Sequence, residues 1–241
     1  MRASNGALSL DSPSAARAAG RDWLSLALID ARNRTLRWLE CLEQQEALYV
    51  APPLEGARPA VAAIGRIGWL QEWWIGRNVQ RLRGESSAVD GIRLASLDRQ
   101  ADRWFSDGAD RWWLAEDEIW PTPDAARVYL EQTLEQTLEL LGVTQECDEA
   151  LLVFRRALAS EDRLSESLAV LAQALGASPP RAGSDHASPP PRPPRDPLWF
   201  PPQLHALGSS PGGWVPPAER WSHEEQVPAF DIDAQAVSWQ R

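Results

Sequence analysis

The chain has 241 residues, of which 44% are hydrophobic, and its formal net charge at pH 7 is -10. This length is enough for one large or two modest domains with a buried core. The acidic balance argues against a polyanionic partner, because nucleic acids and anionic membrane surfaces attract clustered Lys and Arg. No apolar run approaches the roughly 20 residues that span a bilayer, and the N-terminal segment lacks the apolar core of a signal peptide. We therefore expect a cytoplasmic protein that binds neither nucleic acid nor membranes.

Residues 20–176 carry apolar side chains at helical spacing, which predicts a mainly α fold, a four-helix bundle with one long crossover connection. Residues 1–19 are expected to form a flexible N-terminus. The first helix is predicted over residues 20–50, because a Pro-Pro pair follows and stops it. The second is predicted over residues 59–83, with Gly84 closing it.

The third and fourth helices have clear start and stop signals. The third is predicted to begin at Pro123, directly after the capping residue Thr122, and to end at Gly142. The fourth is predicted over residues 147–175, with Gly176 as its C-terminal cap. These signals make the second half of the bundle the better-defined half.

The connection between the second and third predicted helices, residues 85–122, is long and aromatic. So many large aromatic side chains are atypical of disorder, so we expect an ordered segment packed over the bundle. Its aromatic residues are Trp104, Phe105, Trp112, Trp113 and Trp120.

Residues 177–197 are rich in proline and are predicted to form a stiff, extended linker. The tail, residues 198–241, is rich in turn residues and has short strand candidates at 227–232 and 236–239. About 44 residues of this composition can hardly bury a core alone. The tail is therefore interpreted as the opening of a second domain that the chain does not complete.

Four segments together resemble one enzyme family. Three of them belong to the predicted bundle and read DARNRTL at 30–36, IGRIGWLQE at 64–72 and FRRALASEDRLSE at 154–166. The fourth, within residues 207–233, includes LGS, GG, an HEE run and VPAFDID. In order and spacing they resemble the ergothioneine and selenoneine synthases, and the selenoneine branch more closely. These are nonheme iron enzymes with a DinB-like helical bundle joined to a domain of the formylglycine-generating-enzyme type.

This resemblance implies a specific chemistry. Such enzymes use Fe(II) and oxygen to join sulfur or selenium to the imidazole ring of a trimethylated histidine. Three histidines of the bundle hold the iron. One lies in a Gly-His-x-x-x-Phe-x-Glu pattern on the second helix, and two form a His-Glu-x-x-His pair on the fourth. Residues i and i+4 lie one turn apart on the same helix face, so both imidazoles reach one ion.

The chain departs from the family at each of these three positions. They are occupied by Arg66, Ser160 and Leu164. A guanidinium stays protonated and has no free lone pair, and a leucine has no donor atom. The bundle cannot supply an imidazole from elsewhere, since every histidine lies in the linker or the tail: His186, His205 and His223. We therefore expect no Fe(II), no other metal site and no catalytic residue in this chain.

Two more specific hypotheses, a carboxylate metal site and an aromatic cage, have less support from the sequence. Carboxylates at family-like positions, Glu72, Glu161 and Glu166, offer hard oxygen ligands, but these suit magnesium or calcium better than iron. Ordinary helix charges are the simpler explanation, with Glu161 or Glu166 paired to Arg66. The tryptophans suggest an aromatic cage for a trimethylammonium group, yet their positions favour packing in the core and the covering segment.

Three functional hypotheses remain. We favour a truncated and degenerate relative of the selenoneine or ergothioneine synthases, inactive alone. The alternative is a non-catalytic DinB-like module that binds a small trimethylammonium-type ligand or a partner protein. A third hypothesis is an enzyme whose missing part comes from a separate chain or from a reading frame that continues past Arg241.

Overall fold

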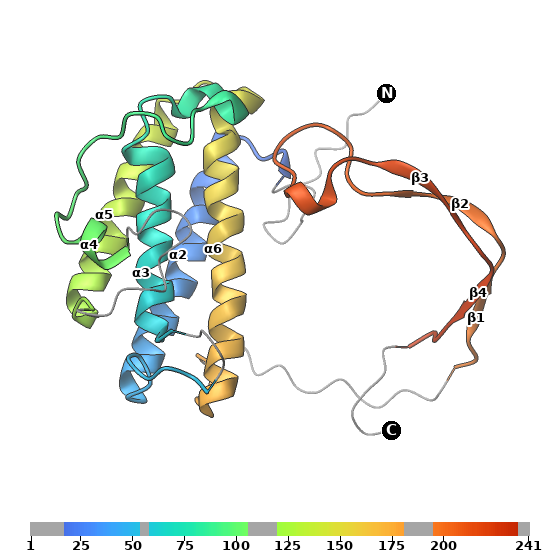
Figure 1. The fold of residues 1–241 in the computed structure, drawn as a ribbon, viewed down its shortest axis with the longest axis horizontal. Coiled ribbons are helices and arrows are strands. Elements are labelled where there is room, and N and C mark those ends of the chain that lie inside the picture. Colours follow the sequence, from blue (N-terminus) through green and yellow to red (C-terminus); the bar gives the residue numbers. More distant parts are fainter. Residues whose placement is uncertain (1–16, 54–57, 106–119, 181–194, 236–241) are drawn as a thin grey trace. The chain divides into compact units, whose positions relative to one another are not determined.

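The computed structural model describes residues 17–53, 58–105, 120–180 and 195–235, and these are mainly helical. The chain divides into two compact units, Met1–Pro180 and Arg181–Arg241. The first unit contains the α-helices, and the second contains short strands and one 3-10 helix, η3 (Pro217–Glu219) (Figure 1). Among the described residues, no helix is long and apolar enough to cross a membrane.

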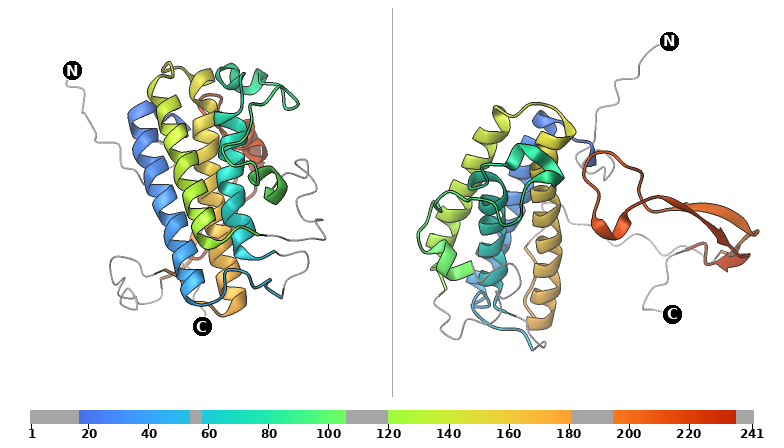
Figure 2. Two further views of the ribbon diagram at one scale, coloured as in Figure 1. Left: turned by 90° about the vertical axis from the view of Figure 1, so that its left-hand side faces the viewer. Right: turned by 45° about the horizontal axis from the view of Figure 1, so that its top comes forward.

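Helices α2, α3, α5 and α6 lie side by side in the first unit (Figures 1 and 2). Helix α2 contacts α6, α5 and α3, and α3 also packs against α5 and α6. The long connection runs from α3 to α5, as the four-helix prediction requires. The bounds are Arg21–Gln44 for α2, Ala60–Gln71 for α3, Pro123–Gly142 for α5 and Asp148–Leu175 for α6.

The start and stop signals predicted for α5 and α6 are confirmed. The Thr122 side chain accepts a hydrogen bond from the amide of Ala125, so it caps the N-terminus of α5 directly before Pro123. Gly176 ends α6 in the left-handed conformation, with φ of 70°. Its amide and that of Ala177 bond back to the last turn of the helix, which satisfies free carbonyl groups.

The first helix is shorter than the 20–50 prediction, which is wrong at its C-terminal end. Helix α2 stops at Gln44, because Glu46 adopts a left-handed backbone with φ of 55°. The amide of Ala47 then bonds to the carbonyl of Leu42 at 2.9 Å, and that of Glu46 to Glu43 at 3.0 Å. This is a Schellman motif without glycine, and it turns Ala47 and the following Leu48 into the core.

The second predicted helix, residues 59–83, is wrong over its second half. After α3 the chain forms one π-helical turn, η1 (Glu72–Gly76), and then a short 3-10 helix, η2 (Arg81–Ser86). Between them lies Asn78, which is fully buried and whose side chain accepts a bond from the Gln80 amide and donates one to Ser87. An Asn that bonds to nearby backbone competes with the helix, which explains the interruption.

Two clusters of buried apolar side chains form the bundle core. In α2, positions spaced by three and four fill both clusters, as the predicted stripe requires, and Trp38 is buried among them. One cluster is built around Leu39, Leu42, Ile64, Leu130 and Leu168. The other is built around Leu24, Leu28, Ile75, Leu141 and Phe154.

The covering segment is ordered where the structure describes it. A short helix, α4 (Ala101–Phe105), brings Trp104 against a third buried cluster formed by Trp69, Ala101 and Tyr129. Trp120 packs against the same cluster. The prediction of aromatic packing is thus confirmed for these two tryptophans, while Trp112 and Trp113 lie outside the described residues.

The second unit contains two antiparallel strand pairs. Strand β1 (Leu198–Phe200) pairs with β4 (Phe230–Ile232), and β2 (Gln203–Leu207) pairs with β3 (His223–Val227). The predicted strand at 227–232 is confirmed at 230–232, which is β4, but it includes only Val227 of β3; β1 and β2 were not predicted. The candidate at 236–239 lies outside the described residues, as do residues 1–16 and most of the 177–197 linker.

We predict that Thr122→Ala destabilises the bundle by about 0.5–2 kcal/mol, because the capping bond to the Ala125 amide is lost. The measurement is the free energy of unfolding in urea. Thr122→Ser keeps the hydroxyl and should stay within about 0.5 kcal/mol of the wild type. Equal losses in both variants would show that the hydroxyl does not act as the cap.

Candidate functional site

A fully buried ion pair lies between α2 and α6. Arg32 and Glu161 are only 1% and 2% exposed, and their side chains meet in a bidentate contact. The Arg32 Nε donates to Glu161 Oε1 at 2.8 Å, and one terminal nitrogen donates to Oε2 at 3.2 Å. Thr35, one turn along α2, also donates to Oε1 at 2.9 Å. Both carboxylate oxygens of Glu161 are therefore occupied by donors from α2.

The rest of the Arg32 guanidinium reaches the other two helices. It donates to the side-chain oxygen of Gln71 on α3 and, on α5, to the carbonyl of Leu130 and the hydroxyl of Thr133. One side chain thus joins all four helices at the same level of the bundle. Such saturation is what a buried charge requires, because each unpaired donor would cost free energy.

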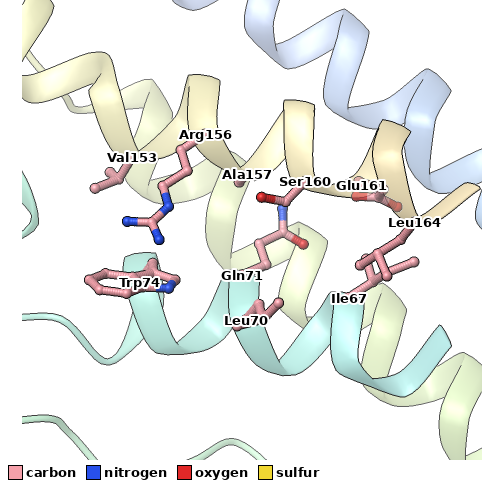
Figure 3. Close-up of a pocket in the computed structure, with 10 residues that line it drawn as sticks. All are labelled: Ile67, Leu70, Gln71, Trp74, Val153, Arg156, Ala157, Ser160, Glu161 and Leu164. Atoms are coloured by element: carbon pink, nitrogen blue, oxygen red, sulfur yellow. The ribbon is translucent and has the colours of Figure 1, made fainter. Parts of the chain in front are cut away.

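Beside this pair, a small cavity opens between α3 and α6, next to the π-helical turn (Figure 3). Its volume is about 20 Å³, which is room for about one water molecule. Apolar side chains form most of its wall. The lining residues are Ile67, Leu70, Gln71, Trp74, Val153, Arg156, Ala157, Ser160, Glu161 and Leu164.

One buried polar atom at the cavity has no hydrogen-bond partner within the described part of the chain. The Gln71 side chain is 4% exposed, and because its oxygen accepts from Arg32, its nitrogen is left without a partner. Figure 3 shows this amide directed from α3 toward Ser160. Arg156 lies with its guanidinium carbon 4.3 Å from the Trp74 ring centroid. Burial lowers the pKa of Arg156, and no carboxylate offsets this effect.

Three residues were compared above with the iron ligands of the family that the sequence resembles. Two of them line the cavity, and the third does not. Ser160 and Leu164, one turn apart on α6, both line the cavity. Arg66 does not line it; its guanidinium carbon lies 5.1 Å from the Trp69 ring centroid. The pKa of Arg66 is lowered, first by burial and then by the nearby charge of Arg58.

The suggested pairing of Glu161 with Arg66 is wrong, because Glu161 is held by Arg32. The α2 sequence did contain a signal for this contact. Position 32 follows the apolar stripe of α2, four residues after Leu28 and three before Thr35, so an inward arginine was predictable. Its partner was not, since the two residues are 129 positions apart in the sequence.

Glu72, the second family-like carboxylate, serves a different part of the fold. It is 1% exposed and accepts hydrogen bonds from the Tyr129 hydroxyl at 2.6 Å, the Ser96 hydroxyl at 2.8 Å and the Leu97 amide. Burial and the charge of Glu72 raise the pKa of Tyr129 well above its usual range. This carboxylate therefore fastens the long connection to the bundle.

The three carboxylates do not form a cluster. Glu72 faces α5 and the connection, Glu161 faces α2, and Glu166 is exposed. Within the residues that the structure describes, no group of three or more His, Cys, Asp and Glu side chains is arranged to hold a metal ion. His205 and His223 lie on β2 and β3 of the second unit, and His186 is outside the described residues.

Several tryptophans of the first unit, including Trp74 at the cavity, already have cations over their rings. Arg77 and Arg93 lie about 5 Å from the Trp73 centroid, and Trp73 stacks on Trp69. Trp74 has both Arg156 and Arg93 beside it, and Trp120 has Arg58 at 5.5 Å. Each of these arginines occupies a place where a ligand cation would have to bind.

Comparison with known proteins gives no further assignment. No protein-family model matches the chain, and no curated protein matches it.

We predict that Glu161→Leu destabilises the protein by about 3–5 kcal/mol, because Arg32 is left as a buried charge without its carboxylate. Urea unfolding followed by far-UV circular dichroism measures the effect. The double variant Arg32→Met/Glu161→Leu should recover most of the loss, since an apolar pair can replace a buried ion pair.

The control is Asp162→Leu, which breaks the half-exposed pair with Arg34 next to Glu161. An exposed pair contributes about 0–1 kcal/mol, so this variant should remain close to the wild type. If Glu161→Leu cost no more than Asp162→Leu, the buried pair would not be a determinant of bundle stability.

Proposed function

We propose that the chain is a non-catalytic, DinB-like relative of the ergothioneine and selenoneine synthases, preferably of the selenoneine branch. The proposal is supported by the four-helix arrangement with its long crossover and by the matching segments at 30–36, 64–72 and 154–166. Residues from all three segments meet around the Arg32 ion pair. The activity of those enzymes is not expected for this chain.

The observation that carries the proposal is the chemistry of the cavity beside α6. Ser160 and Leu164 line it one turn apart, as the paired iron histidines of the family would. One offers a neutral hydroxyl and the other no donor atom. The adjacent carboxylate, Glu161, accepts three hydrogen bonds from α2 and has a guanidinium as its neighbour. These residues do not fit ferrous iron, which takes imidazole and free carboxylate ligands.

The alternative, a module that binds a trimethylammonium group, has less support. An aromatic cage requires open ring faces, and Trp74, the ring that lines the cavity, has arginines at 4.3 and 5.6 Å from its centroid. A ligand cation would have to displace a guanidinium and then remain beside it. Like charges at this distance repel each other, which opposes the binding of a cation.

We predict that the purified protein, reconstituted anaerobically with Fe(II) and desalted, retains far less than one iron per chain. Metal analysis measures the iron content, and incubation with a trimethylated histidine, a sulfur or selenium donor and oxygen should give no coupled product. Near-stoichiometric iron together with product would refute the proposal. A saturable calorimetric signal with the trimethylated histidine and no turnover would favour the ligand-binding alternative.

A designed variant serves as the positive control. In Ser160→His/Leu164→His, two imidazoles one turn apart face the cavity, so this variant should bind cobalt(II) with a 1:1 stoichiometry, measured by its visible absorption. Leu164→His alone should bind far more weakly. If the double variant failed to bind while remaining folded, positions 160 and 164 would not share the face assigned to them.

A further inference from the structure

The Gln71 side-chain nitrogen is a buried donor at the cavity between α3 and α6, and it has no acceptor within the described part of the chain. The Gln71 side chain is only 4% exposed. Arg32 donates to its oxygen, which fixes the nitrogen on the side of the amide that faces Ser160 (Figure 3). Buried polar groups in native proteins have partners, and a donor left without one costs free energy. The nitrogen therefore requires an acceptor in the cavity.

The volume of the cavity limits that acceptor to a single small molecule. The free space is about 20 Å³, and one water molecule requires roughly 10–15 Å³ of such space. A carboxylate or a phosphate has several non-hydrogen atoms and needs more room. A metal cation is also opposed, because the amide presents a donor and because Arg32 holds the Glu161 carboxylate.

The wall also supplies acceptors for the two hydrogens of a water molecule. Ser160 lines the cavity, and a hydroxyl can accept as well as donate. Glu161 lines it too, and within the described residues its Oε2 atom accepts one bond, from Arg32 at 3.2 Å. A carboxylate oxygen can accept a second bond. With the Gln71 nitrogen this makes three polar partners, the usual number for a buried water.

We propose that the cavity is a binding site for one ordered water molecule that bridges α3 and α6. The water accepts a hydrogen bond from the Gln71 nitrogen and donates to the Ser160 hydroxyl and the Glu161 carboxylate. It completes the network of the buried ion pair, because Arg32 binds the oxygen of the Gln71 amide and the water binds its nitrogen. The site stands whether or not the chain belongs to the synthase family.

The test is a water-selective NOE and ROE measurement by NMR on the full ¹⁵N-labelled chain. A water that stays bound while the protein tumbles gives NOE and ROE cross-peaks of opposite sign, whereas chemical exchange gives the same sign. We expect cross-peaks of opposite sign between water and the Gln71 side-chain amide, and none for the exposed Gln44 side chain. The lack of such cross-peaks at Gln71, the result for a dry cavity or a bound chloride, would overturn the proposal.

Two variants at position 160 separate the water from the nearby hydroxyl, which can relay magnetisation from bulk solvent. Ser160→Ala removes the hydroxyl but leaves room for a water held by Gln71 and Glu161, so the cross-peaks should persist. Ser160→Val places a methyl group in the cavity, so they should disappear. Loss of the cross-peaks in Ser160→Ala, or their persistence in Ser160→Val, would refute the site.

The matched control is Ser167→Val, which makes the same change at an exposed position of α6 outside the cavity. This variant should keep the Gln71 cross-peaks. Backbone ¹⁵N spectra check that each variant folds. The wild-type measurement tests the site independently of all three variants.

Discussion

The buried pair of Arg32 and Glu161 is the interaction on which the bundle's interior depends. Removing two charges from water costs several kcal/mol for each ion, and only close contacts with full hydrogen bonding recover that cost. Here the carboxylate is held by α2, while the guanidinium also reaches α3 and α5. One side chain therefore fixes how the four helices are positioned relative to one another along the bundle axis. Apolar clusters above and below supply the burial energy, but they would tolerate small shifts that this pair does not.

The same pair determines what the neighbouring cavity can do. Because Arg32 takes both oxygens of Glu161, the carboxylate facing the cavity is not free to ligate a cation. Because Arg32 also takes the Gln71 oxygen, the amide nitrogen is directed toward the cavity. One contact thus fixes both the pairing of the carboxylate and the orientation of the Gln71 amide beside the cavity.

The sequence predicted those parts of the fold that depend on local signals. Helices α5 and α6 were placed correctly because Thr122, Pro123 and Gly176 act on their own turns. The end of α2 was missed because its left-handed residue is Glu46, where glycine is the usual signal. The early end of the second predicted helix was missed because Asn78 interrupts the helix through side-chain bonds that helical periodicity does not reveal. The site required contacts across more than 100 positions, such as that of Arg32 with Glu161, which a single sequence cannot specify.

The tryptophan content alone does not show whether the rings can bind a ligand cation, because this depends on which side chains lie over them. Thirteen tryptophans in an acidic chain suggest sites for cations. In the structure, the rings along α3 and its π-turn are paired with arginines, so the cation-π attraction is satisfied within the chain. The Arg156 guanidinium over Trp74 therefore occupies a ring face that a ligand cation would need.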